Sequence, residues 1–154
     1  HWSFDHGGIH FVGLDNVSGP GVGDDQLAWL EKDVAATASA TPIVVLAHRP
    51  LFDLYADWGW TTSDGQRALD VLGKHPNVTV FFGHIHQALS RTTPAPNGGI
   101  AHHAARSLVF PFPAPGAAPE KKPLPWDGSA RDHGIGYRSV AETTGTPAIE
   151  ETPF

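Results

Sequence analysis

The chain has 154 residues, of which 40% are hydrophobic and 17% charged, and its formal net charge is −6. This length and hydrophobic content suit one globular domain with its own core. The negative charge offers no basic stripe for the phosphates of a polymer, and no apolar run approaches the roughly 18 residues of a membrane span. We therefore expect neither a nucleic-acid polymer nor a membrane among the partners.

Cysteine is absent from the chain, whereas histidine occurs ten times. The absence of thiols excludes disulfides, thiolate catalysis and cysteine zinc sites, and it leaves the compartment open. Histidines are therefore the main candidates for metal ligands.

The chain opens with a predicted antiparallel hairpin. Apolar segments at 2–5 and 9–14 flank His6-Gly7-Gly8, and glycine tolerates the positive φ of a tight turn. Because the first residue, His1, is not a methionine and the strand pattern begins at once, we expect sequence to be missing upstream.

The middle of the chain alternates predicted helices with predicted strands. Apolar residues recur at helical spacing over 24–37 and again over 63–75. The short, continuous apolar runs 42–47 and 78–82 predict buried strands, the first of them buried on both faces. Strand, helix and strand in this order predict a βαβ unit of a layered α/β domain.

The last third of the chain has a less regular pattern. Segments 88–92 and 100–109 are candidate strands around a turn-rich stretch. Proline alternates with Ala, Phe and Gly over 110–126, which blocks regular hydrogen bonding and predicts an extended surface segment. Segment 134–140 predicts a last strand before a polar tail.

Three histidines follow the two predicted buried strands. His48 comes directly after 42–47, and His84 follows Gly83 after 78–82. Ligands collect at the carboxyl ends of strands in open α/β sheets. In an extended segment, His84 and His86 project to the same side. Because imidazole binds zinc, iron, manganese and nickel, these residues together predict a metal site, although each alone suits a loop or capping role.

Two motifs at these strand ends, Ala47-His48-Arg49-Pro50 and Gly83-His84-Ile85-His86-Gln87, resemble the last two signature blocks of the calcineurin-like metallophosphoesterases. This family includes the purple acid phosphatases and the class III cyclic-nucleotide phosphodiesterases. The opening Ser3 to Phe11 and the stretch Gln26 to Leu30 resemble it too. The resemblance spans residues 1 to about 90 and covers only the C-terminal half of the family's domain.

The resemblance implies an α/β fold that is part of a four-layer βαβα sandwich. Residues 1–110 would form the C-terminal half of that domain, with 111–154 as a Pro/Gly-rich extended segment and tail packed on it. His48 and His84 would bind one metal ion and His86 the other. The family's Asp-x-His block, its Gly-Asp block with the bridging carboxylate and its Asn-His block with the general-acid histidine are absent here. We expect that acid upstream.

The implied activity is metal-dependent hydrolysis of a small phosphoester substrate, by a phosphatase or a phosphodiesterase. The cofactors would be divalent or trivalent metal ions such as Fe, Mn or Zn, normally two, with fewer expected in this chain. Without the bridging ligand two nearby cations repel, so we expect no hydrolysis by these residues alone. The alternatives are a non-catalytic metal-binding or interaction domain and a structural domain whose histidines bind nothing.

Part of a sandwich leaves an apolar sheet face and edge exposed, so we expect self-association or pairing with the missing N-terminal half. Arg49 is a candidate phosphate contact, with an acidic partner as the alternative. Tyr55, Trp58 and Trp60 are candidates to roof the crevice and stack on substrate, or only to cover the sheet edge. The histidines interpreted as turn or surface residues are His6, His10, His75 and His133.

Overall fold

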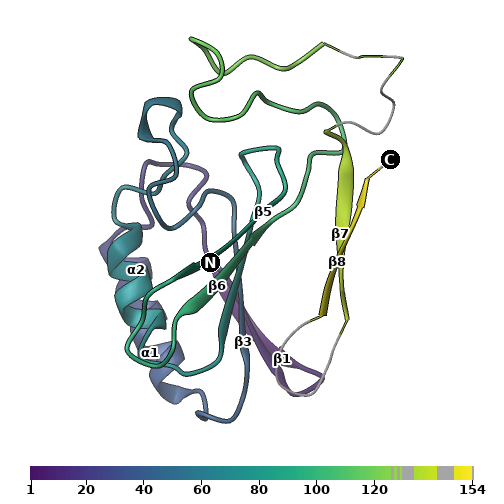
Figure 1. Cartoon of the computed structure of the whole chain (residues 1–154). Coiled ribbons are helices and arrows are strands. Elements are labelled where there is room, and N and C mark those ends of the chain that lie inside the picture. The colour runs from purple at the N-terminus through teal and green to yellow at the C-terminus, as the bar shows by residue number, and fades with distance from the viewer. Residues whose placement is uncertain (126, 128, 130–133, 142–147, 154) are drawn as a thin grey trace.

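A computed structural model describes residues 1–125, 127, 129, 134–141 and 148–153. It contains a six-stranded sheet in the order β1-β2-β3-β4-β6-β5, two helices and a two-stranded sheet of β7 and β8 (Figure 1). The strands are β1 Trp2–His6, β2 Ile9–Gly13, β3 Ile43–Ala47, β4 Val78–Phe82, β5 Leu89–Thr93, β6 Ile100–Ala104, β7 Gly136–Ala141 and β8 Ala148–Pro153. The helices are α1 Asp24–Ala36 and α2 Gly65–Leu72, and Ala56–Trp58 form a 3-10 turn.

The centre of the larger sheet is parallel. Strands β2, β3, β4 and β6 run in one direction, and the edge strands β1 and β5 pair antiparallel to their neighbours. Helix α1 joins β2 to β3 and α2 joins β3 to β4, so both crossovers are βαβ units. The predicted α/β class is confirmed. Neither helix in the described part of the chain is long and apolar enough to cross a membrane.

The core lies between the sheet and the two helices, which cover the same face (Figure 1). Alternate residues of the central strands point toward the helices, and Val12, Val45 and Val80 are completely buried there. Leu30 of α1 and Leu72 of α2 are completely buried as well. Every second residue of the central strands therefore packs against the apolar face of the two helices, and together they form one core.

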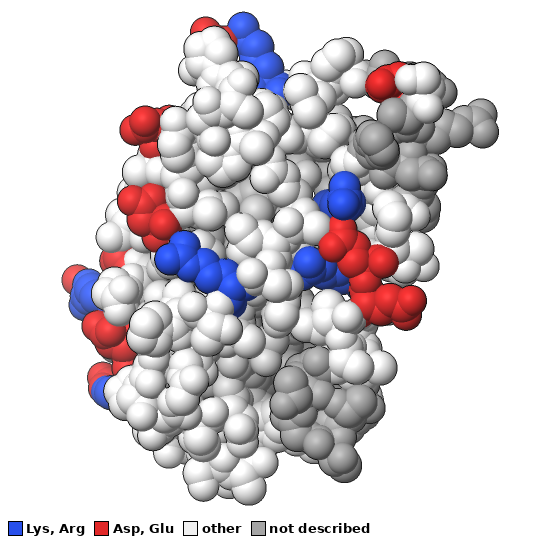
Figure 2. Space-filling model, viewed as in Figure 1, with Lys and Arg blue, Asp and Glu red and all other residues white. Residues whose placement is uncertain are grey.

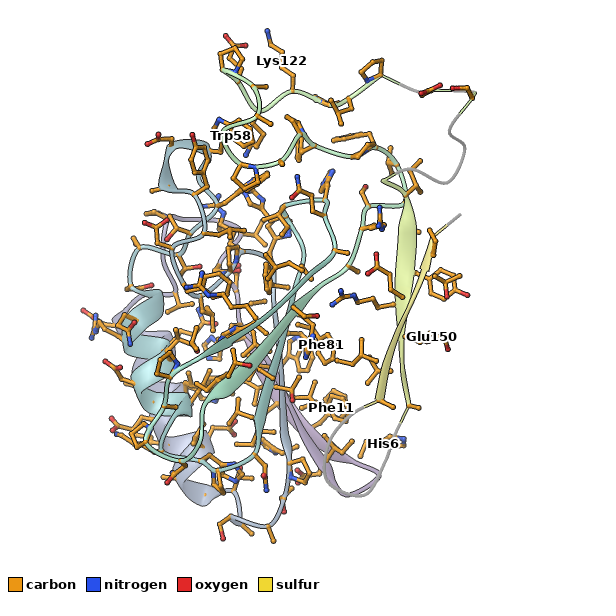
Figure 3. All side chains as sticks on the ribbon, viewed as in Figure 1. His6, Phe11, Trp58, Phe81, Lys122 and Glu150 are labelled. Atoms are coloured by element: carbon orange, nitrogen blue, oxygen red, sulfur yellow. The ribbon has the colours of Figure 1, made fainter. Side chains whose placement is uncertain are left out.

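The opposite face of the sheet carries exposed aromatic and aliphatic side chains. Trp2 stacks on Phe4, and Phe4 stacks on Phe11, with ring centroids 5.5 and 5.2 Å apart. Figure 3 shows Phe11 and Phe81 between this sheet and the β7–β8 hairpin. On this face Val44 is 6% exposed and Leu46 is 40% exposed, so the prediction that 42–47 is buried on both faces holds for Ile43 to Val45 and fails at Leu46.

Two boundaries differ from the prediction. Helix α2 begins at Gly65, and the carboxylate of its N-cap residue Asp64 does not cap the helix but accepts hydrogen bonds from the N–H groups of Val22 and Gly23, in the loop before α1. The expected polar tail includes a strand, since residues 148–153 pair antiparallel with β7. His133 and Trp126 lie outside the described residues.

Two histidines interpreted as turn or surface residues are buried. His10 is 8% exposed and lies within β2, so that interpretation is wrong for it. His75 is 6% exposed but does lie in a turn, after α2, where its backbone N–H donates to the carbonyl of Leu72. His75 contacts the carbonyl of Ala38 through Nε2, and its Nδ1 accepts from the N–H of Asn77. His10 lies between two carboxylates, as described below.

Candidate metal centre

The loops after β3 and β4 meet at one edge of the sheet. Ala47 and Phe82, the last residues of these parallel strands, are register partners. The N–H of Gly83 donates to the carbonyl of His48 at 3.1 Å, so the two loops are also bonded to each other. Parallel neighbours therefore bring His48 and His84 together, as expected for the carboxyl edge of an α/β sheet.

His48 and His84 each bring one ring nitrogen within hydrogen-bond distance of the other. Nδ1 of His84 lies 3.0 Å from Nε2 of His48, and the rings are edge to face with centroids 4.8 Å apart. Ligand bonds of 2.0–2.1 Å would separate two imidazole nitrogens by about 3.3 Å on a tetrahedral ion and by about 2.9 Å at adjacent octahedral positions. The observed distance lies between these values, and it is also the distance of a hydrogen bond between the two rings.

The surroundings keep both imidazoles in the neutral form that binds metals. Burial is the largest cause that lowers the pKa of His84, and the charges of Lys121, His48 and Arg49 lower it further. A hydrogen bond with the backbone of Gly59 raises it, and the net result is a pKa of about 4. The pKa of His48 is lowered by burial and by the charges of Arg49 and His86. Neutral rings bind a cation at pH 7 without first releasing a proton.

His86 points to a different partner. Its Nδ1 donates to the carbonyl of Phe110 at 2.9 Å, and its ring stacks on Phe112 with centroids 4.6 Å apart. When Nδ1 carries the proton, Nε2 has the free lone pair and is the atom that can bind a metal. Among the described residues, no three His, Asp or Glu side chains form a group that could hold a metal ion. The structure thus joins His48 with His84 and does not bring His86 into that pair.

The backbone of this loop differs from the predicted extended segment. His84 and His86 have φ of 64° and 56°, in the left-handed region, and the side chain of Ile85 between them is fully buried. The expectation that 84 and 86 project to the same side of a strand is therefore wrong. Positive φ costs energy for a residue with a Cβ, and such strain concentrates at functional sites.

Asn16 is a site residue that the sequence analysis missed. Its Oδ1 accepts from the N–H groups of His48 and Arg49 at 2.9 and 3.1 Å, and its Nδ2 donates to the carbonyl of Arg49 and to Thr62 Oγ1. The side chain is completely buried. It follows β2 at the same sheet edge as the histidines, so the strand-end rule applied to β2 as well as to β3 and β4 would have found it.

The proline-rich segment is held against this edge. Nε2 of Gln87 donates to the carbonyls of Phe112 and Pro113, at 3.1 and 2.6 Å, and His86 donates to Phe110. The described part of 110–126 contains no helix or strand, as the proline pattern predicts. Its attachment to the histidine loop was not predicted, because the partners are side chains some 25 residues away.

The aromatic loop mainly covers the sheet edge. Trp60 is completely buried and Trp58 is 9% exposed, with their rings edge to face 5.1 Å apart. Tyr55 packs against Trp58 in the same way. Trp60 is therefore a core residue and cannot roof a crevice, which favours the covering role for this loop.

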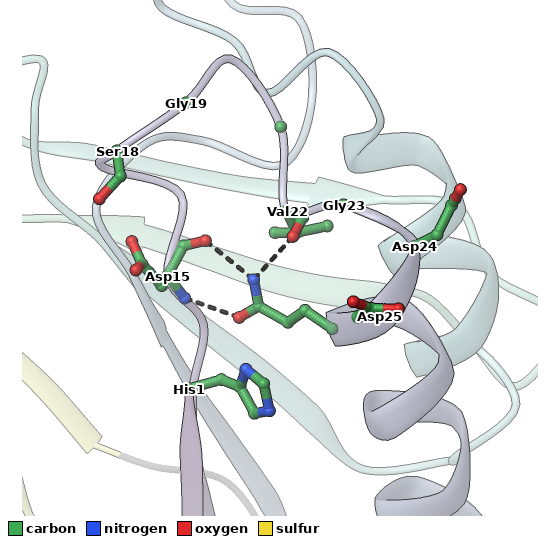
Figure 4. A pocket seen from close by; sticks show the side chains of 10 residues that line it. His1, Asp15, Ser18, Gly19, Val22, Gly23, Asp24 and Asp25 are labelled. Atoms are coloured by element: carbon green, nitrogen blue, oxygen red, sulfur yellow. Dashed lines mark hydrogen bonds between the residues drawn. The ribbon is translucent and has the colours of Figure 1, made fainter.

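A hollow of about 700 Å³ lies elsewhere, at the N-terminal end of α1 (Figure 4). Asp15, Asp24 and Asp25 line it, and Gln26 bonds with the backbone of Asp15 and Val22 beside them. None of the three predicted histidines lines it. Its acidic lining repels a phosphate anion, so it does not suit a phosphoester.

Comparison with known proteins places the fold. No family model and no curated protein matches the sequence. A purple acid phosphatase from yellow lupin (Lupinus luteus) seeds matches with a TM-score of 0.57 and 19% identity over 90% of this chain. A dimetal phosphatase from Danio rerio matches with a TM-score of 0.48 and 22% identity over 56% of this chain. The chain spans 27% of the length of each of these proteins. The chain therefore shares the fold of the part of the purple acid phosphatase that it matches, which agrees with the fold that its resemblance to the calcineurin-like metallophosphoesterases implied.

Proposed function

We propose that this chain supplies C-terminal metal-binding histidines to a metal-dependent phosphoester hydrolase. The observation that carries the proposal is the 3.0 Å approach of His84 Nδ1 to His48 Nε2 where two parallel strands end. The phosphatase-like fold and the neutral state of both rings support it.

The residues of this chain would have separate roles. His48 and His84 bind one divalent or trivalent ion, such as Fe, Mn or Zn, and His86 offers Nε2 to a second. Asn16 fixes the backbone of His48 through its two accepted hydrogen bonds. When bound, the ions supply Lewis-acid stabilisation of phosphoryl oxygens and an acidified water.

The proposal is tested on three purified proteins, namely the parent chain and the single variants His48→Ala and His84→Ala. For each of them, metal content is measured and zinc is titrated. Each variant removes one of two ligands, so we expect a loss of affinity of about ten-fold or more. His6→Ala, an exposed histidine at the end of β1, is the matched control and should bind zinc as the parent does. Wild-type affinity in both site variants would refute the assigned ligands.

A non-catalytic metal-binding or interaction domain is the second candidate. The absence of a three-ligand group from the described residues favours it, because a two-metal site needs more donors than two imidazoles. A chromogenic phosphodiester and a chromogenic phosphomonoester distinguish the candidates in a longer protein that contains this chain. If the longer protein hydrolyses either ester and His48→Ala abolishes this activity, the chain belongs to a hydrolase. If the longer protein binds metal but hydrolyses neither ester, the chain is a non-catalytic metal-binding domain.

A further inference from the structure

Arg49 carries a positive charge that no carboxylate neutralises in the described part of the chain. Its backbone is bonded to Asn16, whereas its buried Nε has no hydrogen-bond partner. A buried donor without an acceptor destabilises the fold, and more so when it belongs to a charged group. The Arg49 charge is close enough to the histidine pair to lower the pKa of both His48 and His84, so an anion that binds there is within its reach.

Lys121 brings a second unneutralised charge to the same place. Its Nζ donates to the carbonyl of Trp58 at 2.9 Å and lies 5.7 Å from the centroid of the Phe112 ring. The next residue, Gly59, is hydrogen-bonded through its backbone to His84, and Phe112 stacks on His86. Contacts on two sides thus hold Lys121 beside the candidate metal centre.

The other described cations differ from this pair in what they contact. The chain has an excess of acidic residues, with 16 Asp and Glu against 10 Lys and Arg. Figure 2 shows blue and red side chains next to one another on the face that it draws. The described cations with a carboxylate partner are Arg67, Lys74, Arg106, Lys122 and Arg138. Lys32 and Arg91 have no ion pair among the described residues, as Arg49 and Lys121 have none, but Arg49 and Lys121 are the two whose charges lower the pKa of His84.

We propose that Arg49 and Lys121 form an anion-binding pair that makes the site selective for the dianion of a phosphomonoester over the monoanion of a phosphodiester. This inference rests on the proposed function, and it narrows the substrate class. A monoester carries about one more negative charge than a diester at pH 7, because its second pKa is near 6. Two uncompensated cations in a partly buried site favour the ligand with the larger charge.

The two side chains differ in what they recognise. The guanidinium of Arg49 offers a planar fork that matches two phosphate oxygens, whereas the ammonium of Lys121 acts as a point charge. A diester has fewer free oxygens than a monoester and adds a second ester group. The pair therefore discriminates by charge and by the number of free oxygens.

The experiment compares methyl phosphate with dimethyl phosphate, titrated at pH 8 into the 154-residue chain and followed by NMR shifts of the loops after β3 and β4. The parent should bind methyl phosphate at least about ten-fold more tightly than dimethyl phosphate. Lys121→Ala and Arg49→Ala should each remove most of that preference. Lys122→Ala is the matched control, since Lys122 is an exposed neighbour paired with Glu120, and it should keep the preference.

Lys121→Met preserves the length of the stem without its charge, so it separates lost charge from lost packing on Phe112. It should behave as Lys121→Ala does. An unchanged preference in Lys121→Met and Arg49→Ala, with dispersed NMR spectra, overturns the inference. The zinc titration described above reports separately on the proposed function. Zinc binding without a phosphomonoester preference refutes only this inference, and a preference without zinc binding refutes only the metal centre.

Discussion

His102 is a completely buried imidazole in β6, on the face of the sheet toward the helices. Its Nε2 is hydrogen-bonded with the hydroxyl of Thr93 at 2.9 Å, whereas its buried Nδ1 has no partner. Burial, followed by the charges of His103 and Arg91, lowers the pKa of His102 to about 4. The ring is therefore held neutral inside the core.

This histidine should make the fold sensitive to acid. Between pH 6.5 and about 4 the unfolded chain binds a proton at this residue that the folded chain does not, so the free energy of unfolding falls as the pH falls. From pH 7 to pH 5 the expected loss is about 2 kcal/mol. Urea unfolding at both pH values measures it, and His102→Gln, which retains an amide for Thr93, should reduce the loss. An equal loss in His102→Gln would contradict this assignment.

At the scale of elements, His10 fastens the β1–β2 hairpin to α1. Its Nδ1 lies 2.7 Å from Asp5 Oδ1 of β1, and its Nε2 lies 2.9 Å from Asp33 Oδ2 of α1. Ser3 also donates to Asp33, at 2.8 Å. Burial lowers the pKa of His10, but the hydrogen bonds and charges of Asp33 and Asp5 offset this effect and leave that pKa raised. The charged ring donates from both nitrogens.

This connection should stabilise the fold most at low pH. Because the folded pKa of His10 is raised, its contribution is complete below pH 6.5 and is lost as the pH rises through the folded value. Asp33→Asn should lower the free energy of unfolding by about 2 kcal/mol at pH 6 and by less at pH 9. Asp5→Asn is the matched control, and it should cost less because the Asp5 side chain is 79% exposed. Equal costs of Asp33→Asn at the two pH values would exclude the charged connection.

The regular elements follow from local patterns, and the site follows only in part. The helices were predicted from apolar residues at helical spacing, β3 and β4 from short continuous apolar runs, and the hairpin from two apolar segments around a glycine turn, all of which are local patterns. His48 and His84 were placed together by one topological rule, that parallel strands end at a common edge. The left-handed backbone of 84 and 86 was not predictable, because it depends on the burial of Ile85 and on the distant carbonyl of Phe110. Lys121 was missed for the same reason, since contacts across some 60 residues position it.

At the scale of the whole molecule, the described residues cover only part of the sheet face opposite the helices. Trp2 and Phe4 remain 46% and 52% exposed beside Leu46, and β1 is an edge strand with one free side. The β7–β8 hairpin is tied to the larger sheet by polar contacts, such as Arg138 with the carbonyl of Leu89. Contiguous apolar surface and an open edge favour association with another chain or segment.

We therefore expect the isolated chain to form dimers or larger species, or to bind a complementary N-terminal half. Leu46→Glu places a charge in the middle of the uncovered face and should shift the chain toward monomer in light scattering. Val109→Glu is the matched control, because Val109 is 75% exposed on the proline-rich side of the molecule and lies outside this face. The shift should occur only for Leu46→Glu, since a buried charge without a partner opposes association. A parent chain that runs as a well-folded monomer would contradict the expected self-association. It would show that the aromatic side chains of this face remain exposed to water in the isolated chain.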